Sequence, residues 1–320
     1  MHHRLLLSIL LLTITLSGAS VWAQNDFDAV EIKATTLSEG ITMLTGAGGN
    51  MGLCIGDDGV FLIDDQFAPL TEKILAVIAG LTDKPVDFVF NTHYHGDHVG
   101  GNENLGDTGS HLISHTNVRR RLKVDQTSTL LGSTAAAVAS GALPTITFTD
   151  SLTFHFNGQD IHSFHIPHAH TDGDGALHFP KANIIHAGDV VFYGLYPYID
   201  TAAGGSIDGM IAGVSQLISL CDDETQIIPG HGPMINKAQL VEHLTMLTAA
   251  RANVAAAMAK GGPEGSSLQE VQATKPCAQW DEELGQAWLT SDQFVQSIFD
   301  SLTLAHYEHD GHEEHEGHHH

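Results

Sequence analysis

A dense group of potential metal ligands lies in the first third of the chain. The run NTHYHGDH at residues 91–98 places three histidines and one aspartate within six residues, directly after an apolar segment. On an extended backbone, residues two apart point the same way, so His93 and His95 can reach one ion together. Asp97 and His98 then turn towards a second ion. Imidazole and carboxylate groups suit zinc, so this run predicts a metal site.

Three later segments offer further ligands after an apolar strand. They contain His170 in PHAHTDGD, Asp189 in HAGD and His231 in PGHG. Open sheets place their sites at the ends of strands, so these side chains are expected near the first group. His168 lies two residues before His170 and could share its side of the strand. Packing at strand edges is predicted for the remaining histidines of this region: His111, His115, His155, His162, His165, His178 and His186.

The order of these motifs resembles that of the metallo-β-lactamase superfamily. The series is His-x-His-x-Asp-His, His-Thr-Asp-Gly-Asp, Gly-Asp and Pro-Gly-His-Gly, and the resemblance covers about residues 30–260. It implies an α/β fold, a four-layer αββα sandwich with the site at one edge. It also implies two Zn²⁺ ions per chain, the first bound by His93, His95 and His170, the second by Asp97, His98 and His231, with Asp189 bridging both. Asp64 matches an aspartate that orients a ligand in this family, or is a simple strand-end aspartate.

The chemistry implied for such a site is metal-assisted hydrolysis. Two ions ~3.5–4 Å apart share a hydroxide that attacks a carbonyl, with Asp97 and Asp189 as the catalytic carboxylates. The substrate is expected to be an ester, thioester, lactone or β-lactam amide. Penicillin-degrading members usually carry Cys or Ser at the position of Asp189, whereas aspartate resembles glyoxalase-type thioesterases and lactonases. β-Lactam hydrolysis is therefore expected to be weak or absent.

The run YGLYPYID at residues 193–200 narrows the resemblance further. It looks most like exported quinoprotein-relay-type zinc metallohydrolases, while the glutathione-binding Gly-Cys-Gly-Arg segment of the glyoxalase type is missing. Tyr193, Tyr196 and Tyr198 either line the pocket or pack. Two other classes stay open: a mononuclear iron enzyme that oxidises persulfides, and a metal-binding protein, which the histidine-rich segment 306–320 would favour.

The N-terminus predicts export. Arg4 precedes a twelve-residue apolar run, and small residues lead to Val-Trp-Ala at 21–23, so residues 1–23 read as a signal peptide cleaved after Ala23. The run is shorter than the ~20 residues that span a bilayer, so no stable membrane insertion is expected after cleavage. The location is then secreted or periplasmic. A net charge of −25 argues against nucleic acid as a partner and leaves a small-molecule substrate.

Hydrophobic periodicity predicts the elements that position these ligands. Strands are predicted at 30–37, 41–45, 51–55, 60–63, 86–90, 151–156, 160–166, 176–179, 183–186 and 226–228. Helices are predicted at 69–81, 207–220, 237–260 and 281–304. Two runs of strands, each followed by helices, predict two stacked sheets with outer helices in one domain, residues 24–305. Residues 306–320 are expected to be disordered. Three cysteines are too few for a disulfide scaffold, although Cys221 and Cys277 could pair.

Overall fold

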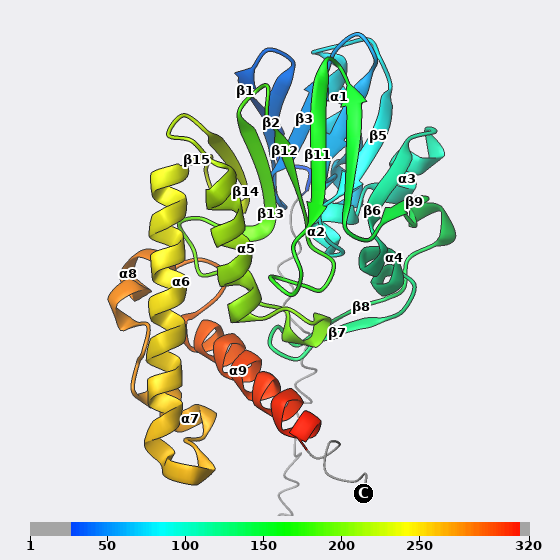
Figure 1. Cartoon of the computed structure of the whole chain (residues 1–320). Coiled ribbons are helices and arrows are strands. Elements are labelled where there is room, and N and C mark those ends of the chain that lie inside the picture. Colours follow the sequence, from blue (N-terminus) through cyan, green and yellow to red (C-terminus); the bar gives the residue numbers. More distant parts are fainter. Residues whose placement is uncertain (1–26, 314–320) are drawn as a thin grey trace, which may run out of the picture.

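Two β-sheets lie face to face at the centre of the structure, and helices cover their outer faces (Figure 1). The computed structural model describes residues 27–313, without the side chains of 263–264 and 305–313. The predicted signal peptide lies outside these residues. The layers are helix, sheet, sheet, helix, which confirms the predicted αββα sandwich.

The first sheet has seven strands in the order β1-β2-β3-β4-β5-β6-β9. Their bounds are β1 Lys33–Ser38, β2 Ile41–Thr45, β3 Met51–Ile55, β4 Val60–Ile63, β5 Val86–Asn91, β6 His111–His115 and β9 Ile146–Phe148. Pairing is antiparallel from β1 to β4 and parallel from β4 to β9. Ile74 and Ile78 of helix α1 (Thr71–Ala79) pack on its outer face. Helix α3 (Asn102–Asp107) adds Leu105 to the same cluster.

The second sheet has six strands in the order β10-β11-β12-β13-β14-β15. Their bounds are β10 Ser151–Phe156, β11 Gln159–His165, β12 Gly175–Phe179, β13 Ile184–Phe192, β14 Gln226–His231 and β15 Ile235–Asn236. Only β13 and β14 pair in parallel. Its outer layer consists of α5 (Ile207–Leu220), α6 (Lys237–Met258) and α9 (Ser291–Glu313), which share one large apolar cluster with β13.

Strand β4 shows how the two apolar layers are built. Its four residues are all buried. Val60 and Leu62 belong to the cluster under α1, whereas Phe61 and Ile63 belong to the cluster between the sheets. A strand that is covered on both faces needs an unbroken apolar run rather than an alternating one, and Val-Phe-Leu-Ile supplies it.

Short elements complete the chain. The helices are α2 Gly96–Val99, α4 Thr116–Leu122, α7 Leu268–Ala273 and α8 Asp281–Leu284, and β7 Gln126–Ser128 pairs with β8 Ser133–Ala135 in a hairpin. Single 3₁₀ turns lie at Ala68–Leu70, Ser140–Ala142, Thr201–Ala203, Ala259–Glu264 and Ala278–Trp280. None of the helices within residues 27–313 is long and apolar enough to cross a membrane. Cys54, Cys221 and Cys277 are all buried and free.

Most predicted elements match the structure to within about three residues at each end, and two differ more. The helix predicted at 281–304 is interrupted at residues 285–290, which separate α8 from α9. Helix α9 then continues to Glu313, into the segment that was expected to be disordered, and residues 314–320 lie outside the described part. The strand predicted at 183–186 extends to Phe192, so Asp189 lies within β13 rather than beyond its end.

Candidate metal centre

Four elements carry the predicted ligands to one edge of the sandwich. The segment after β5 holds the His93–His98 run, and α2 begins inside it. His170 lies in the connection between β11 and β12, and His231 is the last residue of β14. Gly188 adopts φ +51°, and the pairing register of β13 with β14 shifts there. This irregularity lies directly before a predicted ligand. Asp189 is that residue.

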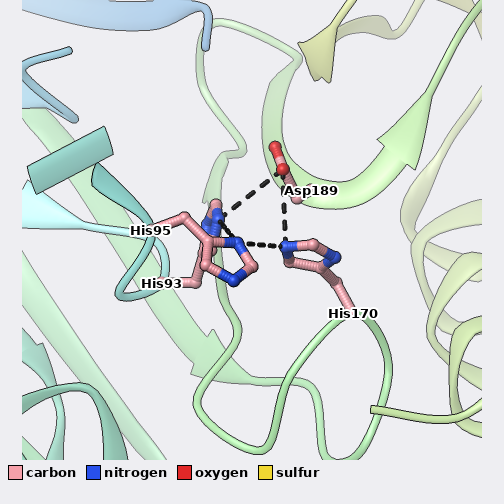
Figure 2. Close-up of side chains that lie close together, drawn as sticks. All are labelled: His93, His95, His170 and Asp189. Atoms are coloured by element: carbon pink, nitrogen blue, oxygen red, sulfur yellow. Dashed lines mark hydrogen bonds and ion pairs between the residues drawn. The ribbon is translucent and has the colours of Figure 1, made fainter. Parts of the chain in front are cut away.

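The first donor group consists of His93, His95, His170 and Asp189, which point towards one another (Figure 2). The Nδ1 atom of His95 lies 3.1 Å from Nε2 of His93 and 2.8 Å from Nε2 of His170. Asp189 Oδ2 lies 3.5 Å from each of these two Nε2 atoms. Three ring nitrogens and one carboxylate oxygen therefore surround one point, the arrangement that a tetrahedral ion needs.

The second donor group consists of Asp97, His98 and His231. Asp97 Oδ2 lies 3.3 Å from Nε2 of His231 and 3.6 Å from Nε2 of His98. Asp189 also faces this group, with Oδ1 3.2 Å from His98 Nε2 and Oδ2 3.4 Å from His231 Nε2. The structure thus brings all seven predicted ligands together in the two predicted sets, with Asp189 between them.

The residues of both groups fit divalent cations. Burying an ionised carboxylate costs free energy, and Asp189 is 5% exposed; its Oδ1 makes no hydrogen bond in the described structure, although His98 Nε2 lies 3.2 Å away. His93, His98 and His170 are also buried, with ring nitrogens directed at the same space. An ion on each side of Asp189 would satisfy these atoms, and the nitrogen and oxygen donors suit zinc.

The two groups differ in protonation. Burial lowers the pKa of His93 well below its usual value and that of His170 to about 4, so both rings are neutral at pH 7 and offer a lone pair. Burial also opposes the charge on His231, but Asp189 and Asp97 outweigh it and raise its pKa to about 9. A cation bound by the second group would replace a proton there, so its uptake releases protons.

Asp64 is in contact with the second group, as the resemblance implies. Its Oδ2 accepts hydrogen bonds from His98 Nδ1 at 2.7 Å and from the Thr92 hydroxyl at 2.8 Å. Its Oδ1 accepts the backbone N–H of Thr92 at 2.7 Å. The carboxylate therefore orients the His98 ring so that Nε2 points at the centre.

Asp200 has a similar position beside the first group, and the sequence analysis missed it. Its Oδ2 accepts hydrogen bonds from His95 Nε2 at 3.0 Å and from the Tyr94 hydroxyl at 2.5 Å. Burial opposes its ionisation, but these two partners outweigh burial and lower its pKa to about 2. The only cue in the sequence is an aspartate closing the run at 193–200, thirty residues beyond His170.

Other predicted residues lie outside the two groups. His168 is exposed, and its Nδ1 contacts the Gly204 carbonyl at 2.9 Å. Tyr196 is buried, and its hydroxyl donates to Asp281 Oδ1 at 2.7 Å, so it packs in the core and does not face the two groups. Tyr198 lies closer to the centre: its ring stacks near His95, and its carbonyl accepts a hydrogen bond from His170 Nδ1 at 2.7 Å.

Comparison with known proteins finds relatives that agree with a metal-binding site at these residues. The family model of the metallo-beta-lactamase superfamily matches residues 44–231, a range that contains all seven candidate ligands. A hydroxyacylglutathione hydrolase of Synechococcus sp. (strain JA-2-3B'a(2-13)) is 28% identical over 228 residues, 68% of this chain and 78% of that protein. A metallo-beta-lactamase from Pontibacter korlensis shares the fold with a TM-score of 0.57 and 20% identity, covering 68% of this chain and 99% of that one. The DIM-1 metallo-beta-lactamase has a TM-score of 0.56 and 20% identity, with 69% and 99% covered.

Proposed function

Because the chain belongs to the metallo-β-lactamase superfamily and is a metal-dependent hydrolase, we propose that it is an exported enzyme with two zinc ions. Its substrate would be a small molecule with a reactive carbonyl: an ester, a thioester, a lactone or a β-lactam amide. The signal-peptide pattern at residues 1–23 supports export. Secreted protein should then begin at or near Gln24, and N-terminal sequencing that finds Met1 would contradict it.

One observation carries the proposal of two ions: the Asp189 carboxylate lies between two complete donor groups. A single ion held by His93, His95 and His170 would leave Asp97, His98 and His231 without a function that accounts for their convergence. This favours a dinuclear enzyme over a mononuclear iron enzyme. A storage protein would not need a shared carboxylate that is 5% exposed.

The bound zinc ions would polarise the substrate carbonyl and activate a water molecule at neutral pH. Asp97 is the more open of the two carboxylates, with 25% of its side chain exposed against 4% for Asp189. Burial opposes their ionisation, but the surrounding histidines outweigh it and lower the pKa of both carboxylates, so both stay ionised and Asp97 is the one that a substrate can reach. Asp64 and Asp200 hold the His98 and His95 rings in place.

A cysteine nucleophile does not fit this site. All three cysteines are buried, and none is among the residues of the donor groups. Burial raises the pKa of Cys54 and Cys221, and it raises that of Cys277 to about 12, so these thiols are protonated at pH 7. Hydrolysis therefore depends on water and the metal-binding residues.

Among the candidate substrates, we propose that esters and thioesters are hydrolysed faster than β-lactams. The relative named hydroxyacylglutathione hydrolase supports a thioester, and so does an aspartate at position 189. The structural likeness to metallo-beta-lactamases at 20% identity concerns the fold alone. The missing glutathione segment suggests a thioester with a different thiol component.

The test is a panel of chromogenic esters, thioesters, lactones and a cephalosporin, assayed with and without a chelator. We expect hydrolysis of an ester or thioester that the chelator abolishes and added zinc restores. Metal analysis of the same sample should find two zinc ions per chain. Turnover that survives complete metal removal, or restoration by iron alone, would contradict the proposal.

A further inference from the structure

A cavity of about 150 Å³ lies between α6, α8 and the segment that follows β13. Figure 1 shows α8 beside α6 on the side of the molecule away from the first sheet. A water molecule occupies ≈ 30 Å³ of liquid, so the cavity has room for a group of several heavy atoms. None of the residues that line it belongs to the two donor groups.

The walls of the cavity combine aromatic rings with acids. The cavity is lined by two half-buried aromatic residues, Tyr193 and Trp280. It is also lined by two exposed acids, Glu242 and Glu283. The Tyr193 hydroxyl donates to Glu242 Oε2 at 3.5 Å and accepts from Gln239 Nε2 at 3.3 Å. No lysine or arginine is among the lining residues. Aromatic faces and carboxylates both attract cations.

His243 adds a buried polar group to this wall. It is 5% exposed, lines the cavity, and its Nε2 has no hydrogen-bond partner in the described structure. Burial lowers the pKa of this ring to about 4, so it is neutral at pH 7 and does not repel a cation. An unpaired buried nitrogen costs free energy that an N–H group of an alkylammonium ligand can offset.

We propose that this cavity binds an organic cation, namely an alkylammonium group, between Trp280, Glu242 and Glu283. The ligand would be a free cation rather than part of the hydrolysed substrate, because the cavity walls and the metal ligands are different residues. The two sites adjoin where the Tyr193 N–H donates to the His231 carbonyl at 3.0 Å and the ring of Phe192 stacks on that of His231.

The test is calorimetric titration of the metal-loaded full chain with tetramethylammonium chloride. Sodium chloride at the same concentration controls for ionic strength, and tert-butanol is a neutral ligand of similar shape. We expect saturable binding of tetramethylammonium and at least tenfold weaker binding of tert-butanol, which lacks the charge. Glu283→Gln should weaken binding at least threefold, and Trp280→Leu about tenfold, because a cation–π contact is lost.

Two matched variants separate a local site from the general negative charge. Glu282→Gln removes the same charge from the neighbouring residue of α8, which does not line the cavity, and Trp288→Leu removes an exposed tryptophan elsewhere. Both should bind tetramethylammonium as the unmodified chain does. The proposal is wrong if tetramethylammonium does not bind, if tert-butanol binds equally, or if Glu282→Gln weakens binding as much as Glu283→Gln. Competitive inhibition of ester hydrolysis by tetramethylammonium would also contradict a separate site.

Discussion

Each histidine of the two donor groups has a second ring nitrogen, and its contacts decide how firmly the ring is held. Four of the five are anchored, by Asp64, Thr92, Asp200 and the Tyr198 carbonyl. For His231 no such contact is found among the described residues, and 22% of its side chain is exposed. The second donor group therefore contains the least constrained ligand, and we expect it to bind its metal ion more weakly than the first group does.

Asp189→Ala tests the shared carboxylate. The first group would keep three histidines. The second would keep Asp97, His98 and His231, but the negative charge of Asp189 would no longer separate its ion from the ion of the first group. We expect the second metal to be lost before the first and turnover to fall on the order of 10²-fold or more. Metal content and rate, measured together, check this. His168→Ala is the control, since His168 lies outside both groups, and should keep both ions. The opposite pattern would refute the role of Asp189.

Asp200→Asn tests the anchor that the sequence analysis missed. An amide is a weaker acceptor for His95 Nε2 than a carboxylate, so the His95 ring should be held less firmly. We expect zinc affinity at the first group to fall about 10–100-fold, as for other residues that orient metal ligands. Competition with a chromogenic chelator measures this affinity. Asp208→Asn, which changes an exposed ion pair with Arg251, should leave it unchanged. Equal affinity in both variants would mean that Asp200 has no orienting role.

At the level of elements, the site depends on the close approach of β13 and β14. A Cβ atom at Gly230 would lie 1.9 Å from Asp189 Oδ1 and 2.7 Å from the carbonyl carbon of Gly188. Neither atom can move freely, because one is a proposed metal ligand and the other is backbone. The Pro-Gly-His-Gly motif thus has a steric reason for its first glycine, beyond placing His231 at the end of a strand.

Gly230→Ala should therefore displace Asp189 and remove at least one metal ion. The matched control is Gly96→Ala in the first motif, where a Cβ atom would meet nothing within 4 Å. We expect the control to keep two ions and its activity, since alanine also favours the first turn of α2. Metal analysis of both purified variants decides the matter. Two ions in Gly230→Ala would show that β14 can shift without disturbing the site.

Helix α6 contributes an acid-sensitive residue. His243 has a pKa of about 4 in the folded protein and about 6.5 when unfolded. Between these values the unfolded chain binds a proton that the folded chain does not, so stability falls as pH decreases from about 6.5 to 4. The loss is on the order of 3 kcal/mol.

Thermal unfolding across pH 4–7 measures this effect. His243→Gln removes the titrating ring, so the midpoint temperature should depend less steeply on pH over this range. His111→Gln, which changes an exposed histidine, is the control and should retain the slope of the unmodified chain. Equal slopes in all three proteins would exclude His243 as a source of acid sensitivity.

Where the sequence analysis was wrong about elements, local signals gave the wrong boundary. Glycine and aspartate at 188–189 resemble a strand end, but pairing with β14 continues the strand to Phe192. The helix predicted at 281–304 runs across residues 285–290, yet α8 ends at Leu284 and Gly285 follows it directly. The short strands β6 and β9 were not predicted, because a few residues carry too little periodicity to distinguish them from loops.

For the whole molecule, the layers and the seven ligands could be predicted because each depends on short sequence patterns. The buried strands are apolar runs, and each ligand lies in a motif of a few residues, six of them at or just after a strand end and Asp189 inside β13. Asp200 and the cavity at Trp280 could not be predicted, since they arise where distant segments pack together. A contact between residues that are farther apart in the sequence than a helical turn or a hairpin leaves no local pattern in a single sequence.

The most direct test of the dinuclear centre is the zinc content of the folded domain when the C-terminal histidines cannot bind zinc. The seven histidines from His306 to His320 are replaced by alanine in the full chain, loosely bound metal is removed on a chelating resin, and zinc is measured per chain. The two donor groups predict two tightly held zinc ions and unchanged hydrolysis. One ion or fewer, with the missing metal restored by the native tail, would contradict a dinuclear centre at His93, His95, Asp97, His98, His170, Asp189 and His231.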